Sequence, residues 1–350
     1  MSTFSAGAAA LTLRPCSGRP PSVIRHEHMS TETDVHDALA SHTDDYAVRD
    51  LLHEVPPHAT YEVTFESRRA VCKLATSDEG DPAAEARLLQ HVDRTASIPV
   101  PRVLAVDDDH FVAAWCDDAP QDPGTVDESR ARTMGAGLAQ LHEETAFDAP
   151  GFFETTVGGA ASDDGRVTEG LALDAHESWQ ETVRALLEER RAFLAKHARG
   201  QAYVDAADDV LALLRERPDL LSGAGDPVLC HGNYLPAHVG IEGDDVTCVV
   251  DFEHALAGPG EYDYWRTALP LLSNEDEAVT SAFRAGYESV RPLPDGFEER
   301  GEVYRLVNTV SYVRSLFLQG NHAGEKAERR ADRMCGYVHE AADSLRDGDA

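Results

Sequence analysis

Hydrophobic and polar residues alternate in the first third of the chain, and this pattern predicts short β-strands. Tyr61, Val63 and Phe65 recur with a period of two and would share one face of a strand. The same pattern predicts further strands at residues 70–75, 103–106 and 111–115. Apolar residues with helical spacing follow Pro82, and proline suits the first turn of a helix, so a helix is predicted to begin there. Residues 45–117 are therefore predicted to form a small sheet with one inserted helix.

The rest of the chain has mainly helical patterns. Apolar residues with helical spacing predict helices at residues 129–142, 173–197 and 203–214, and several more within residues 274–345. Residues 151–170 are rich in Gly, Ser and Asp and are predicted to form a loop. One strand-rich stretch, residues 227–253, interrupts the helices. We therefore expect an α+β protein in which a small antiparallel sheet is followed by a larger helical part.

The charge balance narrows the functions that are open to the chain. Its 350 residues include 63 Asp and Glu but only 31 Lys and Arg, which gives a formal net charge of −32. Nucleic-acid binding needs clustered basic residues that neutralise phosphates, so this composition argues against it. The shortage of basic residues also argues against a basic helix that lies on a membrane surface. No run of the sequence reaches the roughly 18 apolar residues of a membrane-spanning helix. We expect a cytoplasmic protein with no nucleic-acid or membrane partner.

Lysine is rare in this sequence. It occurs only at Lys73, Lys196 and Lys326, and the other 28 basic residues are Arg. An acidic surface with little lysine is typical of proteins that work in molar salt, where the Debye length shrinks to about 3 Å. We interpret the chain as halophilic, of haloarchaeal type; an acidic mesophilic protein from a GC-rich genome is the alternative.

The first residues differ in composition from the rest. Residues 1–28 carry three Arg against one Glu, whereas the remainder is strongly acidic. A short apolar stretch at residues 8–13 has no basic region before it, which argues against a secretory signal. We interpret residues 1–28 as a disordered extension, or as the product of a start codon placed before Met29.

The cysteines show no pattern of a metal or redox motif. No two of the six have the C-x-x-C spacing. Four lie in apolar, strand-like runs: Cys72, Cys116, Cys230 and Cys248. We expect the cysteines to be small buried hydrophobic residues, neither ligands nor disulfide partners.

Residues 227–253 carry the pattern that predicts chemistry. An apolar strand ends at Cys230 and is followed by the polar residues 231–233, and after a hairpin a second apolar strand ends at Asp251. This order brings two polar loops to one edge of a sheet, with the Asp251 carboxylate at its rim. Carboxylate oxygen is a good ligand for Mg²⁺, so the stretch predicts a magnesium ligand at Asp251.

These motifs resemble those of the aminoglycoside phosphotransferase family, the small-molecule branch of the protein-kinase-like fold. That family has H-G-D-x-x-x-x-N in its catalytic loop, followed by a metal motif of the D-x-E or D-F-G kind. Here residues 231–233 (H-G-N) match the start of the loop, His238 stands at the position of its Asn, and residues 251–253 (D-F-E) match the metal motif. The resemblance implies a two-lobed fold, with a nucleotide-binding lobe at residues 29–117 and a helical lobe at residues 118–350.

The N-terminal part is similar to the same family. The family has a Lys on the third strand of its sheet and a Glu on the next helix, and this chain has Lys73 and Glu85 at those places. Such an ion pair positions nucleotide phosphates. The resemblance also implies that Trp115 and Asp117 belong to the hinge that binds adenine through its backbone, and that Asp263 has a structural role.

The function implied by the resemblance is transfer of a phosphate from ATP or GTP to a hydroxyl group of a small molecule, with Mg²⁺ as cofactor. Asp251 would bind the metal, with His238 as a second ligand. His231 would organise the catalytic loop, and Asn233 would position the acceptor hydroxyl. The oligomeric state stays open.

Three departures from the family motifs keep a second function open. Asn233 replaces the aspartate that orients the proton of the acceptor, and an amide cannot accept a proton at neutral pH. His238 replaces an asparagine, and residues 53–60 lack the glycine of a phosphate-binding loop. Loss of general acid–base catalysis costs a factor on the order of 10²–10⁴. The alternative is a catalytically impaired kinase-like protein that binds a nucleotide or metabolite without turnover.

Overall fold

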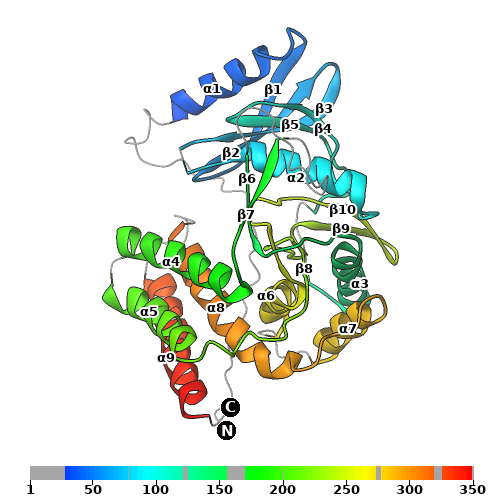
Figure 1. The fold of residues 1–350 in the computed structure, drawn as a ribbon. Coiled ribbons are helices and arrows are strands. Elements are labelled where there is room, and N and C mark those ends of the chain that lie inside the picture. The colour runs from blue at the N-terminus through cyan, green and yellow to red at the C-terminus, as the bar shows by residue number, and fades with distance from the viewer. Residues whose placement is uncertain are drawn as a thin grey trace.

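The computed structural model describes residues 28–77, 79–120, 125–155, 170–198, 200–272, 277–318 and 325–348. These residues form a sheet-rich N-terminal lobe and a larger, mainly helical C-terminal lobe (Figure 1). The expected α+β class is confirmed. Of the extension expected at residues 1–28, only His28 falls within the described part of the chain, where it begins a helix.

The N-terminal lobe is built on a five-stranded antiparallel sheet in the order β1-β2-β3-β5-β4. Its strands are β1 (Tyr46–Val55), β2 (His58–Phe65), β3 (Arg68–Ala75), β4 (Val103–Val106) and β5 (His110–Ala114). Tyr61, Val63 and Phe65 are all buried on one face of β2, as their period of two predicted. On that face they belong to a core that also includes buried residues of helix α1 (His28–Ala40).

Helix α2 (Pro82–Thr95) connects the other face of the sheet to the C-terminal lobe. The Asp81 side chain accepts a hydrogen bond from the Ala84 N–H at 2.9 Å, and proline occupies the first turn, so the helix begins where the sequence predicted. Leu88 and the other buried residues of α2 share one core with the helices of the C-terminal lobe. This start places Glu85 in the first turn of the helix, close to strand β3.

The C-terminal lobe consists mainly of helices. Within the described residues these are α3 (Glu128–Glu144), α4 (Trp179–His197), α5 (Gln201–Glu216), α6 (Gly260–Leu272), α7 (Glu277–Glu288), α8 (Phe297–Leu318) and α9 (Glu325–Asp347). A four-stranded antiparallel sheet has the order β7-β6-β11-β8, and β9 and β10 form a hairpin. These strands are β6 (Gly151–Thr155), β7 (Leu171–Ala175), β8 (Pro227–Cys230), β9 (Val239–Glu242), β10 (Asp245–Val249) and β11 (Leu256–Pro259). The residues after β8 and β10 carry the motifs that predict chemistry.

Two expectations for residues 151–197 are wrong. Strand β6 occupies the start of the predicted loop, and strand β7 occupies the first residues of the helix predicted at 173–197, which begins instead at Trp179. The helix begins there because the Ser178 side chain accepts a hydrogen bond from the Glu181 N–H at 3.3 Å. The two strands are short and pair with each other, and β6 also pairs with β11, which lies about 100 residues further along the chain. A local pattern does not record such pairing.

The expectation for the cysteines is wrong for one pair. Cys116, directly after β5, forms a disulfide with Cys248 in β10 across 132 residues of sequence. The segment after β5 packs tightly on the hairpin, since a Cβ added at Gly240 would lie 2.4 Å from the Asp118 carbonyl oxygen. Three other cysteines are free and buried, as expected: Cys72, Cys230 and Cys335. Cys16 lies outside the described residues.

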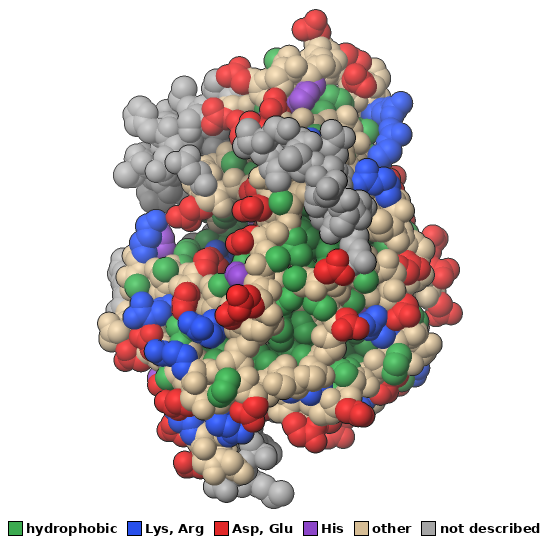
Figure 2. Space-filling model, viewed as in Figure 1, with side chains coloured by type: hydrophobic (Ala, Val, Ile, Leu, Met, Phe, Trp, Pro, Cys, Tyr) green, Lys and Arg blue, Asp and Glu red, His purple; other side chains and the backbone are tan. Residues whose placement is uncertain are grey.

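Acidic side chains are dispersed over the surface. Figure 2 shows Asp and Glu across both lobes on the visible face, interspersed with fewer Lys and Arg. Acidity is therefore a general property of this surface and does not mark one binding site. In the described part of the chain, no helix combines the length and the apolar character that crossing a membrane requires.

We expect reduction of the Cys116–Cys248 disulfide to destabilise the protein. A cross-link across 132 residues restricts the unfolded chain, and loss of such a bond typically costs about 2–5 kcal/mol. The free energy of unfolding of the wild type should therefore fall when dithiothreitol is added. In the double variant Cys116→Ser/Cys248→Ser, the control, the reductant should have no effect. Equal stability of the wild type with and without reductant would contradict the cross-link.

Candidate active site

Lys73 on β3 lies among three carboxylates that come from both lobes. Its Nζ atom is 2.7 Å from Glu85 Oε2 on α2, 3.0 Å from Asp251 Oδ1 and 2.7 Å from Glu253 Oε2. Lys73 is 7% exposed and Glu85 is 4% exposed, so water screens these charges only weakly. The structure thus brings together the lysine, the helix carboxylate and the metal motif that the sequence singled out.

The carboxylates keep Lys73 charged in spite of its burial. Burial is the largest influence and lowers the pKa of Lys73, but the charges of Asp251, Glu85 and Glu253 outweigh it and hold that pKa well above its usual value. Burial, the largest influence, raises the pKa values of Asp251 and Glu253, but the charge of Lys73 together with neighbouring histidines brings both below their usual range. Burial raises the pKa of Glu85. Two ionised carboxylates beside one ammonium leave an excess of negative charge.

The loop after β8 is held in place by Asp263 of helix α6. Its Oδ2 atom accepts the His231 N–H at 2.6 Å, and its Oδ1 atom accepts the Gly232 N–H at 3.0 Å. Burial, the largest influence, raises the pKa of Asp263, but the hydrogen bond and charge of His142, together with His231, bring it below its usual value. A buried, ionised carboxylate therefore fixes the backbone of the loop.

Two motif residues have a left-handed backbone conformation. Gly232 has φ +73°, and a Cβ at this position would lie 2.0 Å from the His254 carbonyl oxygen, so only glycine fits. Asp251 has φ +69°, a conformation that costs a residue with a side chain about 1–3 kcal/mol. The next residue, Phe252, is fully buried, with its ring centroid 4.4 Å from that of His231. This packing supports the conformation that turns the Asp251 carboxylate toward the lysine.

His231 is positioned to organise the loop. Its Nε2 atom donates to the Val250 carbonyl oxygen at 3.0 Å, and its Nδ1 atom accepts the Asn233 N–H at 3.2 Å. Burial, opposed by the charge of Asp263, lowers the pKa of His231 to about 4. Both ring nitrogens of this neutral imidazole have partners, which agrees with the organising role that the sequence suggested.

His238 connects the loop to the metal motif. Its Nδ1 atom donates to the Asn233 carbonyl oxygen at 2.8 Å, and its Nε2 atom lies 3.4 Å from Asp251 Oδ2. Its side chain is 20% exposed. The structure therefore brings His238 and the backbone of Asn233 beside Asp251, as the order of the motifs predicts.

His58 is a member of this site that the sequence did not reveal. It follows the Pro56-Pro57 turn between β1 and β2, is buried, and has its Nδ1 atom 2.9 Å from Glu253 Oε2. The Pro57 carbonyl oxygen accepts the Thr76 N–H at 2.7 Å, which holds the turn at the end of β3. The turn without glycine therefore contacts the metal motif through His58. The only sequence feature that marks His58 is its position directly after two prolines. Its partner, Glu253, lies far away in the sequence.

Trp115 and Asp117 do not join this cluster through their side chains. The Trp115 N–H donates to the Arg69 carbonyl oxygen at 3.2 Å, and the Arg69 guanidinium lies over the Trp115 ring at 3.6 Å. The Asp117 side chain is 88% exposed and lies 3.8 Å from the same guanidinium. Both side chains therefore contact the start of β3. A contribution of the backbone at Trp115 and Asp117 to adenine binding stays a prediction.

Three carboxylates of the site have the chemistry of a Mg²⁺ ligand set. Oxygen atoms of Glu85, Asp251 and Glu253 all lie within 4.8 Å of one another. Mg²⁺ prefers hard oxygen ligands, and the excess negative charge of the cluster would attract a divalent ion. The side chains of Asp251 and Glu253 are 27% and 23% exposed, whereas Glu85 is buried against the lysine. The residues fit the ion, with Asp251 and Glu253 as the accessible ligands.

Two lobes that meet at a Lys–Glu–Asp cluster, beside a loop held by a buried carboxylate, define a kinase-like protein of the phosphotransferase type. A family model described as "Phosphotransferase enzyme family" (APH) matches residues 58–301, which include Lys73, Asn233, Asp251 and Asp263. The chain belongs to this family. A comparison with curated proteins found no match.

Solved structures with a similar fold agree with this assignment. A thermostable mutant of aminoglycoside phosphotransferase APH(4)-Ia, in a ternary complex with ADP and hygromycin B, has a TM-score of 0.59 at 14% identity over 89% of this chain and 98% of that chain. A candidate fructosamine-3-kinase from Haemophilus somnus 129PT has a TM-score of 0.60 at 17% identity, over 87% and 96% of the two chains. Another from Thermobifida fusca has a TM-score of 0.56 at 22% identity, over 86% and 93%. These likenesses confirm the kinase-like fold.

We expect the protein to lose stability as the pH falls from about 7 to 4. The pKa of His231 is about 4 in the folded protein, below the ordinary 6.5, so the unfolded chain binds more protons across this range. Neutral His231 therefore contributes stability that is complete above pH 6.5 and is lost as the pH falls toward 4, with a magnitude of about 3 kcal/mol. Denaturant unfolding across this pH range measures the loss.

A variant and a direct titration serve as controls for the pH dependence. His231→Gln should weaken the dependence, whereas replacement of the exposed His53 by Gln should leave it as in the wild type. The NMR titration of the His231 imidazole should show a neutral ring at pH 5.5. A His231 resonance that titrates near pH 6.5 would contradict the expectation.

Proposed function

We propose that this protein is a Mg²⁺-dependent kinase that transfers the γ-phosphate of ATP or GTP to a hydroxyl group of a small metabolite in the cytoplasm. The observation that carries the proposal is the buried Lys73 ammonium, 2.7 Å from Glu85 and 3.0 Å from Asp251. The contact supports the proposal because, between the two lobes, it would set a phosphate-binding cation beside a metal-binding carboxylate. The ADP and hygromycin B bound to the similar APH(4)-Ia structure support a nucleotide donor and a small-molecule acceptor.

In this proposal Lys73 binds the nucleotide phosphates. Its ammonium donates hydrogen bonds to Asp251 at 3.0 Å and to Glu253 at 2.7 Å, so nucleotide binding would exchange these partners for phosphate oxygens. Glu85 would continue to hold the lysine side chain. Asp251 and Glu253 would hold Mg²⁺, which when bound neutralises charge on the transferred group. The compact ammonium suits phosphates at this position in a way that a planar guanidinium does not.

Asn233 would position the acceptor hydroxyl. Its amide oxygen can accept a hydrogen bond from a hydroxyl but cannot take up the proton. Phosphoryl transfer passes through a loose transition state, in which positioning and charge neutralisation contribute most. Loss of a general base therefore slows transfer, by a factor on the order of 10²–10⁴, without abolishing it.

A second candidate function is binding of a nucleotide or metabolite without phosphate transfer. The amide at Asn233 favours it, because an amide cannot take up the proton of an acceptor hydroxyl. The two functions share a binding step and differ in turnover.

We expect Asp251→Asn to lower phosphate transfer by about 10²-fold or more, because loss of one electrostatic stabiliser of the transition state typically costs about 10²–10³-fold. The measurement is transfer of labelled γ-phosphate to a panel of hydroxyl metabolites, with Mg²⁺ in molar KCl. Asp244→Asn removes the same charge from the exposed turn between β9 and β10 and should keep the wild-type rate. Unchanged transfer in the Asp251 variant would show that the assignment is wrong.

The substitution Asn233→Asp separates the two functions. If the wild type is an enzyme that works through the amide, it transfers phosphate already, and the variant should be faster by a factor of up to about 10²–10⁴, because a carboxylate can take up the proton of the acceptor. Nucleotide affinity, measured in parallel by calorimetry, reports whether the site is intact. If transfer arises in the variant and is absent from the wild type, the native protein is a binding protein and the leading proposal fails.

A further inference from the structure

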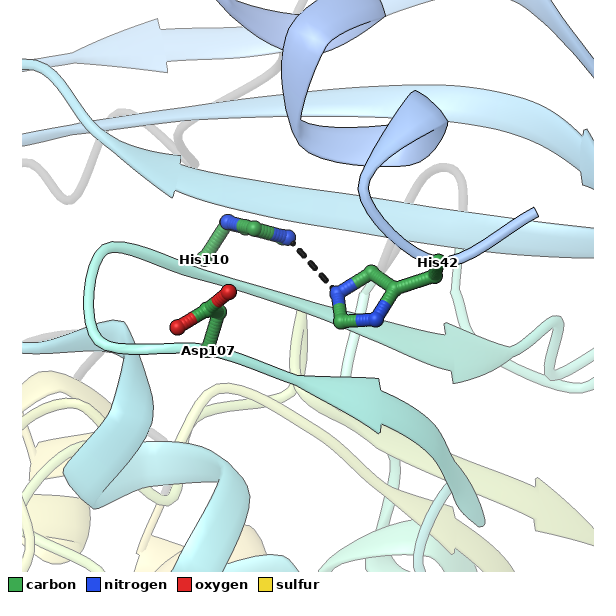
Figure 3. Close-up of side chains that lie close together, drawn as sticks. All are labelled: His42, Asp107 and His110. Atoms are coloured by element: carbon green, nitrogen blue, oxygen red, sulfur yellow. Dashed lines mark hydrogen bonds between the residues drawn. The ribbon is translucent and has the colours of Figure 1, made fainter. Parts of the chain in front are cut away.

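Three side chains of the N-terminal lobe converge outside the active site (Figure 3). His42 follows helix α1, Asp107 follows strand β4 and His110 begins strand β5. Each offers one ligand atom, and these atoms all lie within 4.8 Å of one another. The Nε2 atoms of His42 and His110 are 2.9 Å apart, and Figure 3 shows the Asp107 carboxylate turned toward the two rings.

Asp109 sets the proton position of His110. Its Oδ1 atom lies 2.7 Å from His110 Nδ1, where a carboxylate accepts the ring N–H. The lone pair of His110 is then on Nε2, the atom that faces His42. In metal sites a carboxylate commonly accepts the second ring N–H of a ligating histidine in this way. The outer hydrogen bond of a metal-binding histidine is therefore already present.

The backbone around the cluster is hydrogen-bonded. The His42 N–H donates to the Leu39 carbonyl oxygen at 3.1 Å, and the Asp107 N–H donates to the His110 carbonyl oxygen at 2.9 Å. One Asp107 oxygen also accepts the Asp108 N–H at 2.9 Å. His110 is 3% exposed.

We propose that His42, Asp107 and His110 bind a divalent transition-metal ion of the Zn²⁺ type. Two imidazole nitrogens and one carboxylate oxygen suit such an ion, whereas Mg²⁺ prefers oxygen ligands. Ligand bonds of about 2.0–2.1 Å in a tetrahedral site place the ligand atoms about 3.3 Å apart. The two histidines, now 2.9 Å apart, would separate slightly, the carboxylate would move inward, and water would complete the coordination.

The ion would join helix α1 to the sheet that carries Lys73. The buried residues Val35 and Leu39 of α1 already pack against the core on the outer face of this sheet. His110 pairs with Leu74 in the register of β3 and β5, directly beside the pair that includes Lys73. A metal clip at this place would stabilise the lobe and the strand pair that positions the lysine, without contact with substrate.

Titration of the full-length protein with Co²⁺ tests the proposal. After treatment with a chelator and its removal, the protein should bind one equivalent of Co²⁺ with the visible absorption of a nitrogen-ligated ion, and Zn²⁺ should displace it and raise the Tm. His42→Gln and Asp107→Asn should each weaken binding at least tenfold. Asp109→Asn should weaken it by about 10–100-fold, the usual effect of losing an outer hydrogen bond.

Two variants separate this cluster from other ligands. His53→Gln removes an exposed histidine of β1 and should bind Co²⁺ like the wild type. Asp251→Asn should also retain the absorption, because the active-site cluster offers carboxylate oxygens. Asp107 is exposed, so its variant should fold even if the His42 variant does not. No such absorption in the wild type, or its retention in both cluster variants, would overturn the proposal and leave a hydrogen bond between two histidines.

Discussion

The arrangement of the two lobes depends on the ion pairs of Lys73. Strand β3, helix α2 and the residues after β10 each supply a charged group to contacts of 2.7–3.0 Å. Removing an ion from water costs several kcal/mol, and a buried charge without a partner is strongly destabilising. The lobes cannot separate here unless something else takes the place of the lost partners. In the proposed function, phosphate oxygens for Lys73 and a divalent cation for Asp251 and Glu253 would take their place.

The residues on which this contact depends could be predicted because each stands at a definite place in a local pattern. Lys73 lies on a strand with alternating apolar residues, and Glu85 lies in the first turn of a helix whose start is marked by Asp81 and Pro82. Asp251 ends an apolar strand. The resemblance in motif order then indicated which of these patterns meet in space. Local patterns and a known order were thus sufficient for the fold and for most of the site.

The features that the sequence did not reveal have one physical cause. Each depends on contact between segments whose local patterns are not distinctive. Cys116 and Cys248 each lie in an apolar run that is equally suited to a buried thiol, and only the packing of the segment after β5 on the β9–β10 hairpin brings them together. His58 begins β2 directly after a turn that shows no glycine pattern, and its partner Glu253 follows a strand of the other lobe. Strands β6 and β7 are short and are specified by their pairing more than by their composition.

Asn233 stands where the family motif has an aspartate. This difference concerns proton uptake and leaves the geometry of the loop intact. The hydrogen bonds that shape the loop at this residue use its backbone: its N–H donates to His231 and its carbonyl oxygen accepts from His238. Asp263 holds the preceding backbone N–H groups independently of the side chain at 233. An aspartate and an asparagine therefore suit the same loop. What distinguishes them is the ability to take up a proton. In the proposed function, Lys73 and the ion held at Asp251 would neutralise the charge of the phosphates, so that binding and proton transfer would fall to separate groups of one site.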